Sequence, residues 1–332
     1  MEVSPQETNR MNNLPVLIIG FNRTSTLRRV VEATLKSSVV GPIYISLDGP
    51  KQNSDGVANG IDPRFLHELS EMSKNGSRVK LLHQAENLGL GNHVRLAIDW
   101  IFESEAVAVI LEDDCLPSQD FFSFASQMLR LYEAEKRVLT VAGTNMPRHY
   151  PAGGQNHFFS RYPRVWGWAT WRDRWIEVDD LRVLPQHVFD AQLEIGLSRL
   201  DRKARSFWIS RMSSSRDPDS NVWEQDLVIR ALAFDLLTVV PSVNLVKNIG
   251  EGGLATHTTA FPKWIRESNH INEQELVLDP YPLPVVRDLR FDSRIEKLQF
   301  NIFPLKEARK RLKRRIDQAY SLIGRLTESA TQ

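Results

Sequence analysis

The chain has 332 residues, and its 42 Lys and Arg residues nearly balance 41 Asp and Glu residues, so the formal net charge is +1. Hydrophobic residues make up 42% of the chain, which excludes a sequence that is disordered throughout. The near-zero charge argues against a general nucleic-acid-binding protein, which needs an excess of cations. The single cysteine, Cys115, excludes an intramolecular disulfide framework.

Residues 1–13 are polar and predict a tail outside the folded domain. They contain no basic segment followed by an apolar one, so no secretory signal is expected. The first apolar run, Val16–Ile19, is too short to cross a bilayer, which takes roughly 20 residues. We therefore expect a cytoplasmic protein.

Residues 14–143 alternate short apolar runs with helical patterns. The run Pro15–Phe21 is continuously apolar with β-branched residues and predicts a buried parallel strand, and further strands are expected at Pro42–Leu47, Arg78–His83, Ala106–Leu111 and Val138–Ala142. Hydrophobic residues at three- and four-residue spacing predict helices from Thr24 or Ser25 to Leu35, and at Pro63–Lys74, Gly91–Glu103 and Pro117–Glu135. This order predicts an α/β fold, a mostly parallel Rossmann-like sheet with helices on both faces.

After residue 143 the sequence changes in character. The segment Tyr150–Trp175 is dense in aromatic residues, Arg and Gly. Helical patterns follow at about 196–213 and 222–236, with a short strand expected at Leu237–Val240. The stretch Asn248–Thr258 contains three glycines, which suit the hinge of a lid, with an ordinary loop as the alternative. Because no linker sequence separates the two halves, we expect one compact unit with an embellished second half.

Near the C-terminus, apolar residues recur at three- and four-residue steps over Pro304–Leu326, which predicts an amphipathic helix within residues 304–327. Its first half is rich in Lys and Arg. Three interpretations stay open: a helix docked on the body with a solvated basic face, a peripheral contact with anionic lipid at the inner face of a membrane, or a dimerisation helix.

Polar side chains follow the predicted strands, and ligands of parallel sheets bind at the carboxyl ends of the strands. These side chains include Arg23 after the first strand, Asp48 after the second and Asn87 after the third. Three consecutive acids, Glu112–Asp114, follow the fourth strand. Acids in such a place are best tolerated where a cation binds, and oxygen ligands suit Mg²⁺ or Mn²⁺. A solvated turn that caps the next helix is the alternative.

Four ordered motifs carry a resemblance to a known family: Gly20–Arg23, Ile45–Gly49, Asn87–Gly89 with Asn92–His93, and Leu111–Asp114. Together they resemble inverting GT-A glycosyltransferases of the N-acetylglucosaminyltransferase I type and related bacterial sugar transferases. The resemblance covers about residues 14–260. It implies a nucleotide-binding half at 14–143 and an acceptor half at 144–260, followed by an extension at 261–303.

The resemblance also implies roles for residues at the strand ends. Asp48 and His93 would hold the nucleobase, typically uracil, and Arg23 would lie beside the nucleotide. The alternatives are an Asp-Gly-Pro turn for Asp48, a partly buried structural histidine for His93 and a surface charge for Arg23. Glu112 and Asp113 would contact hydroxyls of the ribose or the sugar. Asp114 would bind Mn²⁺ or Mg²⁺ that bridges the diphosphate, where the metal neutralises charge on the leaving group.

An inverting enzyme needs a general base for the acceptor hydroxyl. In the family this acid follows a Trp in the second half, and Trp223-Glu224-Gln225-Asp226 fits that pattern at the start of a predicted helix. Glu224 is the first choice and Asp226 the second. The positive end of a helix keeps either carboxyl group ionised, as a base requires. Both acids in purely structural roles are the alternative.

Three further positions in the second half are candidates. Trp166 or Trp168 would line the donor-sugar or acceptor pocket, with an aromatic core cluster as the alternative. The resemblance makes His257 a second candidate metal ligand, with a surface or capping histidine as the alternative. No His and Asn partners that would activate Cys115 as a nucleophile are evident in the sequence, so Cys115 is expected to be a small packing residue.

The leading hypothesis is a metal-dependent, inverting glycosyltransferase that moves sugar from a UDP-sugar to a hydroxyl of a glycan or lipid-linked acceptor. By resemblance, assembly of a surface polysaccharide is the expected setting. A sugar nucleotidyltransferase, a non-catalytic carbohydrate- or nucleotide-binding protein on the same fold, and a retaining transferase are the alternatives. The first of these is disfavoured because the loop after the first strand has one glycine, Gly20, and such enzymes carry a Gly-rich phosphate loop there.

Overall fold

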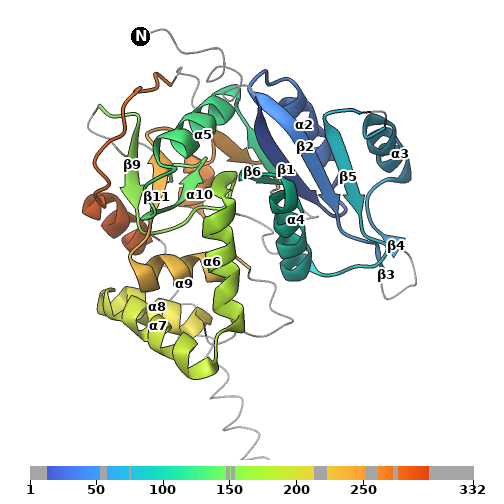
Figure 1. Ribbon diagram of the computed structural model, residues 1–332. Coiled ribbons are helices and arrows are strands. Elements are labelled where there is room, and N and C mark those ends of the chain that lie inside the picture. The colour runs from blue at the N-terminus through green and yellow to red at the C-terminus, as the bar shows by residue number, and fades with distance from the viewer. Residues whose placement is uncertain are drawn as a thin grey trace, which may run out of the picture.

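An eight-stranded mixed sheet forms the centre of the molecule (Figure 1). The computed structural model describes residues 13–52, 58–74, 76–146, 150, 154–212, 223–250, 261–271 and 276–298. The strands lie in the order β5-β2-β1-β6-β10-β8-β11-β9. In chain order their bounds are β1 Leu14–Gly20, β2 Val40–Leu47, β5 Val79–His83, β6 Val107–Glu112, β8 Val138–Ala142, β9 His157–Ser160, β10 Trp168–Trp171 and β11 Leu237–Pro241.

The parallel part of the sheet matches the sequence-based expectation. Strands β5, β2, β1 and β6 pair in parallel, as do β8 and β11. Two strands were not expected: β10 runs antiparallel between β6 and β8, and β9 runs antiparallel at the edge beside β11. Both lie in the aromatic segment, where the sequence lacks the β-branched run that marked the other strands.

Helices cover both faces of the sheet, as predicted. Alternate residues of β1 point to opposite faces. Val16 and Ile18 belong to a core cluster with α2 (Thr24–Leu35), α3 (Pro63–Met72) and α5 (Gln119–Leu131). Leu17 and Ile19 belong to a cluster with α4 (Leu90–Ser104), α6 (Arg172–Val183) and α9 (Glu224–Phe234). The first strand is therefore buried on both sides.

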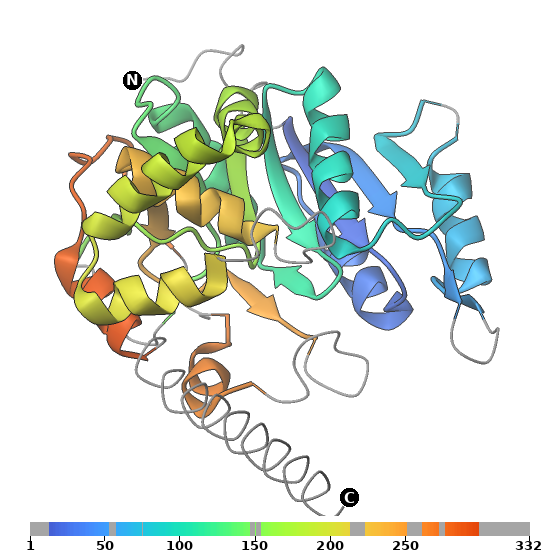
Figure 2. The ribbon, with the colours of Figure 1, turned by 90° about the horizontal axis from the view of Figure 1, so that it is seen from below.

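A third core cluster lies at the opposite end of the molecule from β5 and α3 (Figure 2). It joins α7 (Gln186–Ser198), α8 (Arg202–Met212) and α9 to the sheet edge at β9 and β11. Phe291 and Ile295, which lie beyond the short helix α10 (Lys263–Ser268), are fully buried in this cluster. The segment expected as an extension thus contributes to the same body as the sheet.

Two small antiparallel ribbons border the main sheet. One pairs β3 (Lys51–Gln52) with β4 (Ala58–Asn59). The other pairs β7 (Cys115–Pro117) with β12 (Val246–Asn248), so the chain beyond β12 returns to the three acids at the end of β6. His257 and the amphipathic segment 304–327 lie outside the described residues, as does nearly all of the 1–13 tail. Among the described helices, none is long and apolar enough to cross a membrane.

Candidate active site

The carboxyl ends of β1, β2 and β6 meet beside the start of α4 (Figure 1). A pocket of about 160 Å³ opens there. Its lining includes five of the predicted site residues: Arg23, Asp48, His93, Glu112 and Asp113. The remaining lining residues are Ile19, Gly20, Phe21, Asn22, Lys51, Asn87, Gly89 and Leu90. The topology therefore brings together residues that are up to 94 positions apart in the sequence, from Ile19 to Asp113.

Arg23 joins the end of β1 to the acids that follow β6. Its Nη1 donates to Asp114 Oδ2 at 2.5 Å and lies 3.5 Å from Asp113 Oδ1. Burial lowers the pKa of the Arg23 guanidinium, but the charges of Asp113 and Asp114 outweigh that effect and raise it. Arg23 is therefore a fixed positive charge, and its guanidinium is the cation that Asp114 contacts.

Burial makes the acidic motif costly to ionise. The pKa of Glu112 is raised well above its ordinary value, first by burial and then by the charges of Asp114, Asp113 and Glu224. Burial likewise raises the pKa of Asp113 to about 7, although Arg23 opposes the shift. Carboxylates crowded in this way favour an additional cation beside them. Because the charge of Glu224 also raises the pKa of Glu112, the first residue of α9 lies near the end of β6.

Asp48 organises the loops on the other side of the pocket. Its Oδ1 accepts hydrogen bonds from the backbone N–H groups of Gly49, at 2.9 Å, and Leu88, at 2.8 Å. Its Oδ2 accepts one from Asn87 Nδ2 at 3.0 Å. Asp48 thus ties the end of β2 to the turn that leads into α4. That turn passes through Gly89 at a φ of 77°, a conformation that favours glycine.

His93 lies on α4 with its ring in the core beneath the pocket. Nε2 hydrogen-bonds to Ser46 Oγ at 2.9 Å. Burial lowers the pKa of His93, so the imidazole is neutral at pH 7.

The two candidate bases occupy different environments. Asp226 is buried, and its Oδ2 lies 2.9 Å from Arg95 Nη2 on α4. Glu224 is only partly buried and lies near Glu112. The first choice, Glu224, is therefore close enough for its charge to act on Glu112, although it is not among the residues that line the pocket. The second choice, Asp226, is an ion-pair partner of Arg95 in the core, because α9 turns it toward α4.

One of the two tryptophan expectations needs correction. Trp168 in β10 is 1% exposed and stacks on Trp223, with ring centroids 5.9 Å apart. It therefore packs in the core and does not line the pocket. Trp166 is partly buried and packs against Phe261, with centroids 5.3 Å apart. The buried position of Cys115, where burial raises its thiol pKa, agrees with a packing residue.

Sequence reasoning missed Lys51 and Arg95, and it assigned Gly250 to the hinge of a lid and not to the acidic motif. Lys51 lines the pocket just after the Asp48-Gly49-Pro50 turn, so the strand-end rule could have found it. Gly250 lies against Asp114 and Arg23, and the backbone N–H of Ile249 donates to Asp114 O at 2.7 Å. The glycine-rich stretch around Gly250 was the signal in the sequence. Arg95 had no local signal, because its partner is 131 positions away.

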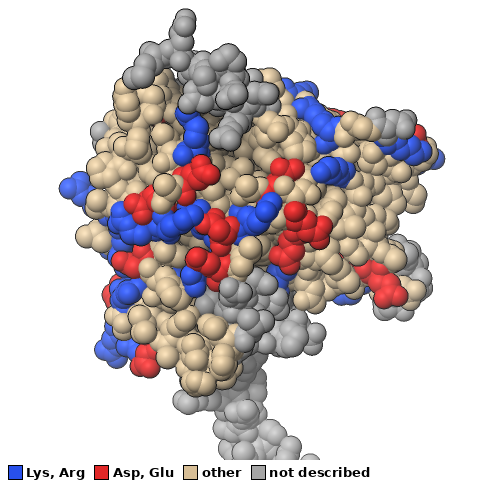
Figure 3. All heavy atoms as spheres, viewed as in Figure 1, with Lys and Arg blue, Asp and Glu red and all other residues tan. Residues whose placement is uncertain are grey.

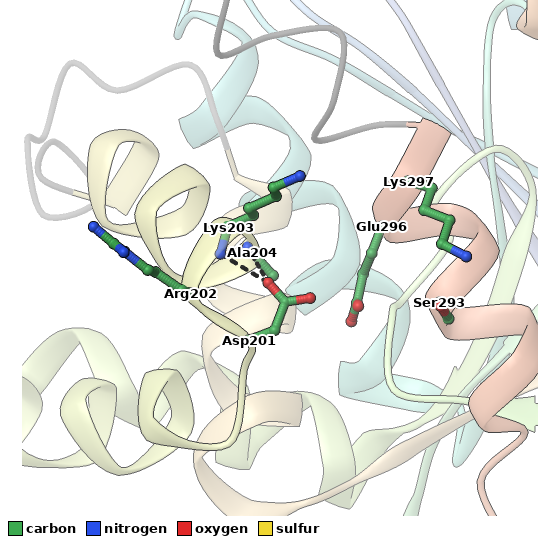
Figure 4. A pocket seen from close by; sticks show the side chains of 7 residues that line it. All are labelled: Asp201, Arg202, Lys203, Ala204, Ser293, Glu296 and Lys297. Atoms are coloured by element: carbon green, nitrogen blue, oxygen red, sulfur yellow. Dashed lines mark hydrogen bonds between the residues drawn. The ribbon is translucent and has the colours of Figure 1, made fainter.

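A second hollow lies between α8 and the helical residues 289–298 (Figure 4). Asp201 caps α8 there by accepting from the backbone N–H groups of Lys203 and Ala204, and Glu296 bonds to Tyr162. Acids and bases both line this hollow, so its charge favours no ligand class. On the face shown in Figure 3, acidic and basic side chains likewise lie side by side.

The model of the GNT-I family matches residues 2–205. The chain belongs to this family of glycosyltransferases. The matched region includes the predicted donor-side residues from Arg23 to Trp168 and ends before Glu224. Among solved structures, the chain is similar to CMP:2-keto-3-deoxy-manno-octonic acid synthetase complexed with CTP. That likeness has 10% identity and a TM-score of 0.33, over 69% of this chain and 89% of that chain.

Proposed function

We propose that this member of the GNT-I family is a metal-dependent, inverting glycosyltransferase with a UDP-sugar donor. The carrying observation is that Glu224, at the start of α9, lies near the Glu112–Asp114 motif of the pocket. A candidate base and a candidate diphosphate site therefore share one locality. A glycan or lipid-linked hydroxyl in a cytoplasmic setting is the acceptor class that we propose.

The acidic motif suits a hard divalent cation. Asp113 and Asp114 offer carboxylate oxygens, and Asp114 Oδ2 already pairs with the Arg23 guanidinium. Among the residues that the structure describes, no three His, Cys, Asp or Glu side chains form a metal cluster. Mg²⁺ in nucleotide sites is commonly held by one or two carboxylates plus substrate phosphates, which this arrangement matches. Bound there, Mn²⁺ or Mg²⁺ would neutralise charge on the departing diphosphate.

The protein residues divide the remaining work. Asp48 and His93 frame the space for the nucleobase, and Arg23 supplies a cation for the diphosphate. Glu224 takes the proton of the acceptor hydroxyl as that oxygen attacks the anomeric carbon. The carbon–oxygen bond to the diphosphate breaks on the opposite face, so the configuration inverts. The N-terminus of α9 favours the ionised form of Glu224 before this step.

A donor screen by thermal shift tests the donor class. We expect UDP-sugars to raise the melting temperature in the presence of Mn²⁺ or Mg²⁺, because a ligand that binds only the folded state stabilises it. GDP- and CMP-sugars serve as controls and should produce smaller shifts. No shift with any nucleotide-sugar would contradict the proposal.

Two variants and one product analysis test the roles. Asp114→Ala should lose metal-dependent donor binding, whereas Glu224→Gln should keep binding and lose transfer by roughly 10²- to 10⁴-fold. NMR of the product should show an inverted anomer. Normal transfer by both variants would contradict the site assignment. Pyrophosphate release from a nucleoside triphosphate would instead support a nucleotidyltransferase.

A further inference from the structure

A buried ion pair joins the two helices that carry the candidate donor and base residues. Arg95 on α4 and Asp226 on α9 approach to 2.9 Å, and each side chain is 8% exposed. Moving two charges out of water costs several kcal/mol per ion, so a buried pair is weak evidence for a gain in stability. A role in fixing the geometry of the two helices is the better explanation.

Helix α4 is a rigid reference for this pair. Val94, Ala97, Ile98 and Ile101 are fully buried between α4 and the sheet. His93, two residues before Arg95, is held by Ser46 at the pocket. The Asp226 side chain, which pairs with Arg95, is therefore held at a fixed position relative to the donor pocket.

Helix α9 transmits this placement to the candidate base. Residues two positions apart on a helix point about 200° apart around its axis. With Asp226 fixed on Arg95, Glu224 must point to a different side, and its charge acts on Glu112. The neighbouring Trp223 is 3% exposed and stacks on Trp168, so the start of α9 has a second anchor in the core.

We propose that Arg95 and Asp226 are positioning residues that set the rotation of α9 and so hold the Glu224 carboxylate toward the Glu112–Asp114 motif. This inference rests on the proposed glycosyltransferase function. It assigns Asp226 to orientation of the base and excludes it as the base. Neither residue contacts the reacting atoms in this assignment.

The test compares Arg95→Met, Asp226→Asn and the double variant with the wild type. Arg230→Met is the matched control, because Arg230 also lies on α9 and pairs with Glu177 of α6 at 2.6 Å. Binding of UDP in the presence of Mn²⁺ is measured by calorimetry, and donor KM and kcat by product formation. Melting temperatures verify that each variant is folded.

We expect kcat to fall roughly 10- to 100-fold in both single variants, the range that a small misplacement of a catalytic group produces. The UDP affinity and donor KM should stay within about threefold of wild type, since the donor pocket is built from the strand ends and α4 is held in the core without Arg95. The double variant should be no slower than the slower single variant, because each change removes the same interaction. Arg230→Met should keep the wild-type kcat.

Each other outcome overturns a defined claim. Loss of transfer in Asp226→Asn as complete as in Glu224→Gln would make Asp226 the base. Folded Arg95→Met and Asp226→Asn with the kcat of Arg230→Met would overturn the positioning role alone. A wild type that neither binds UDP nor transfers sugar would overturn the proposed function and this inference with it. If a single variant does not fold, the charge-free double variant and Arg95→Lys replace it. We expect kcat to be partly recovered in Arg95→Lys relative to the double variant. A wild-type kcat in both replacements would overturn the positioning role.

Discussion

Gly250 lies where the end of β12 returns to the acidic motif. A Cβ placed on this residue would collide with Asp114 Oδ2 and lie 2.8 Å from Arg23 Nη1. Both atoms belong to the Arg23–Asp114 ion pair. The backbone of Gly250 therefore approaches the site so closely that any larger residue would displace the Asp114 and Arg23 side chains.

We predict that Gly250→Ala leaves the fold intact but weakens metal-dependent UDP binding by at least about 10-fold, since Asp114 and Arg23 must both move. Calorimetry with UDP and Mn²⁺ measures this loss. Gly76→Ala is the control, because a Cβ at Gly76 meets nothing within 4 Å. Its positive φ of 73° should cost about 1 kcal/mol of stability and leave binding unchanged. Equal binding by both variants would contradict the proposed role of Gly250.

At this scale the strand-end rule predicted which side chains the fold brings together. Arg23, Asp48 and Glu112–Asp113 line one pocket because parallel strands end at the same edge. The environments of Asp226 and Trp168 could not be predicted. Both depend on contacts with distant residues, Arg95 on α4 and Trp223 on α9, and one sequence does not encode such contacts locally.

At the scale of elements, a buried polar network connects β9 to residues 277–283. The ring of His157 bonds to Asn156 Oδ1 and, at 2.6 Å, to the hydroxyl of Tyr132 on the other side. Tyr132 in turn accepts from the backbone N–H of Leu283 at 2.9 Å. Asn156 Nδ2 donates to Val277 O at 3.2 Å. Residues 277–283 are thus attached through groups that surround one histidine.

This network predicts acid sensitivity. Burial lowers the pKa of His157 to about 4, below its ordinary value near 6.5. The unfolded chain therefore binds more protons than the folded one between those values, and stability falls as the pH drops through that window. The loss attributable to His157 is up to about 3 kcal/mol. Urea denaturation at pH 7 and pH 4.5 measures it.

His157→Gln should be less stable at pH 7 but should lose less stability between pH 7 and pH 4.5 than wild type. The exposed His67, on α3, provides the control. His67→Gln should show the pH dependence of wild type. An unchanged pH dependence in His157→Gln would show that another group governs the acid sensitivity.

The predicted elements show why some strands are easier to recognise than others. The strands β1, β2 and β6 are apolar runs, β5 is a mixed segment with Lys80 and His83, and the expected and observed bounds of all four differ by two residues or fewer. β10 is the tetrapeptide Trp168–Trp171, which carries no alternation and was interpreted as an aromatic segment. Its place between β6 and β8 depends on long-range pairing, so the antiparallel insertion was missed.

At the scale of the whole molecule, residues 289–298 close the end of the body near α8. Phe291 is fully buried and packs on Tyr150 and Phe158, with ring centroids 5.0 and 4.7 Å away. Next to it, the buried Asp292 accepts a hydrogen bond from Ser160 Oγ at 2.6 Å. The chain beyond α10 therefore completes the sheet edge at β9.

We predict that Phe291→Ala destabilises the whole protein by about 3–5 kcal/mol, because it removes a buried aromatic ring and leaves a cavity. Leu289→Ala is the matched control: Leu289 is 65% exposed two residues earlier, so its change should stay within about 0.5 kcal/mol. Urea denaturation followed by tryptophan fluorescence and by circular dichroism measures both. If residues 289–298 belong to the same cooperative unit as the sheet, the two signals shift together in Phe291→Ala. A loss confined to a minor early transition would show instead that this segment unfolds separately.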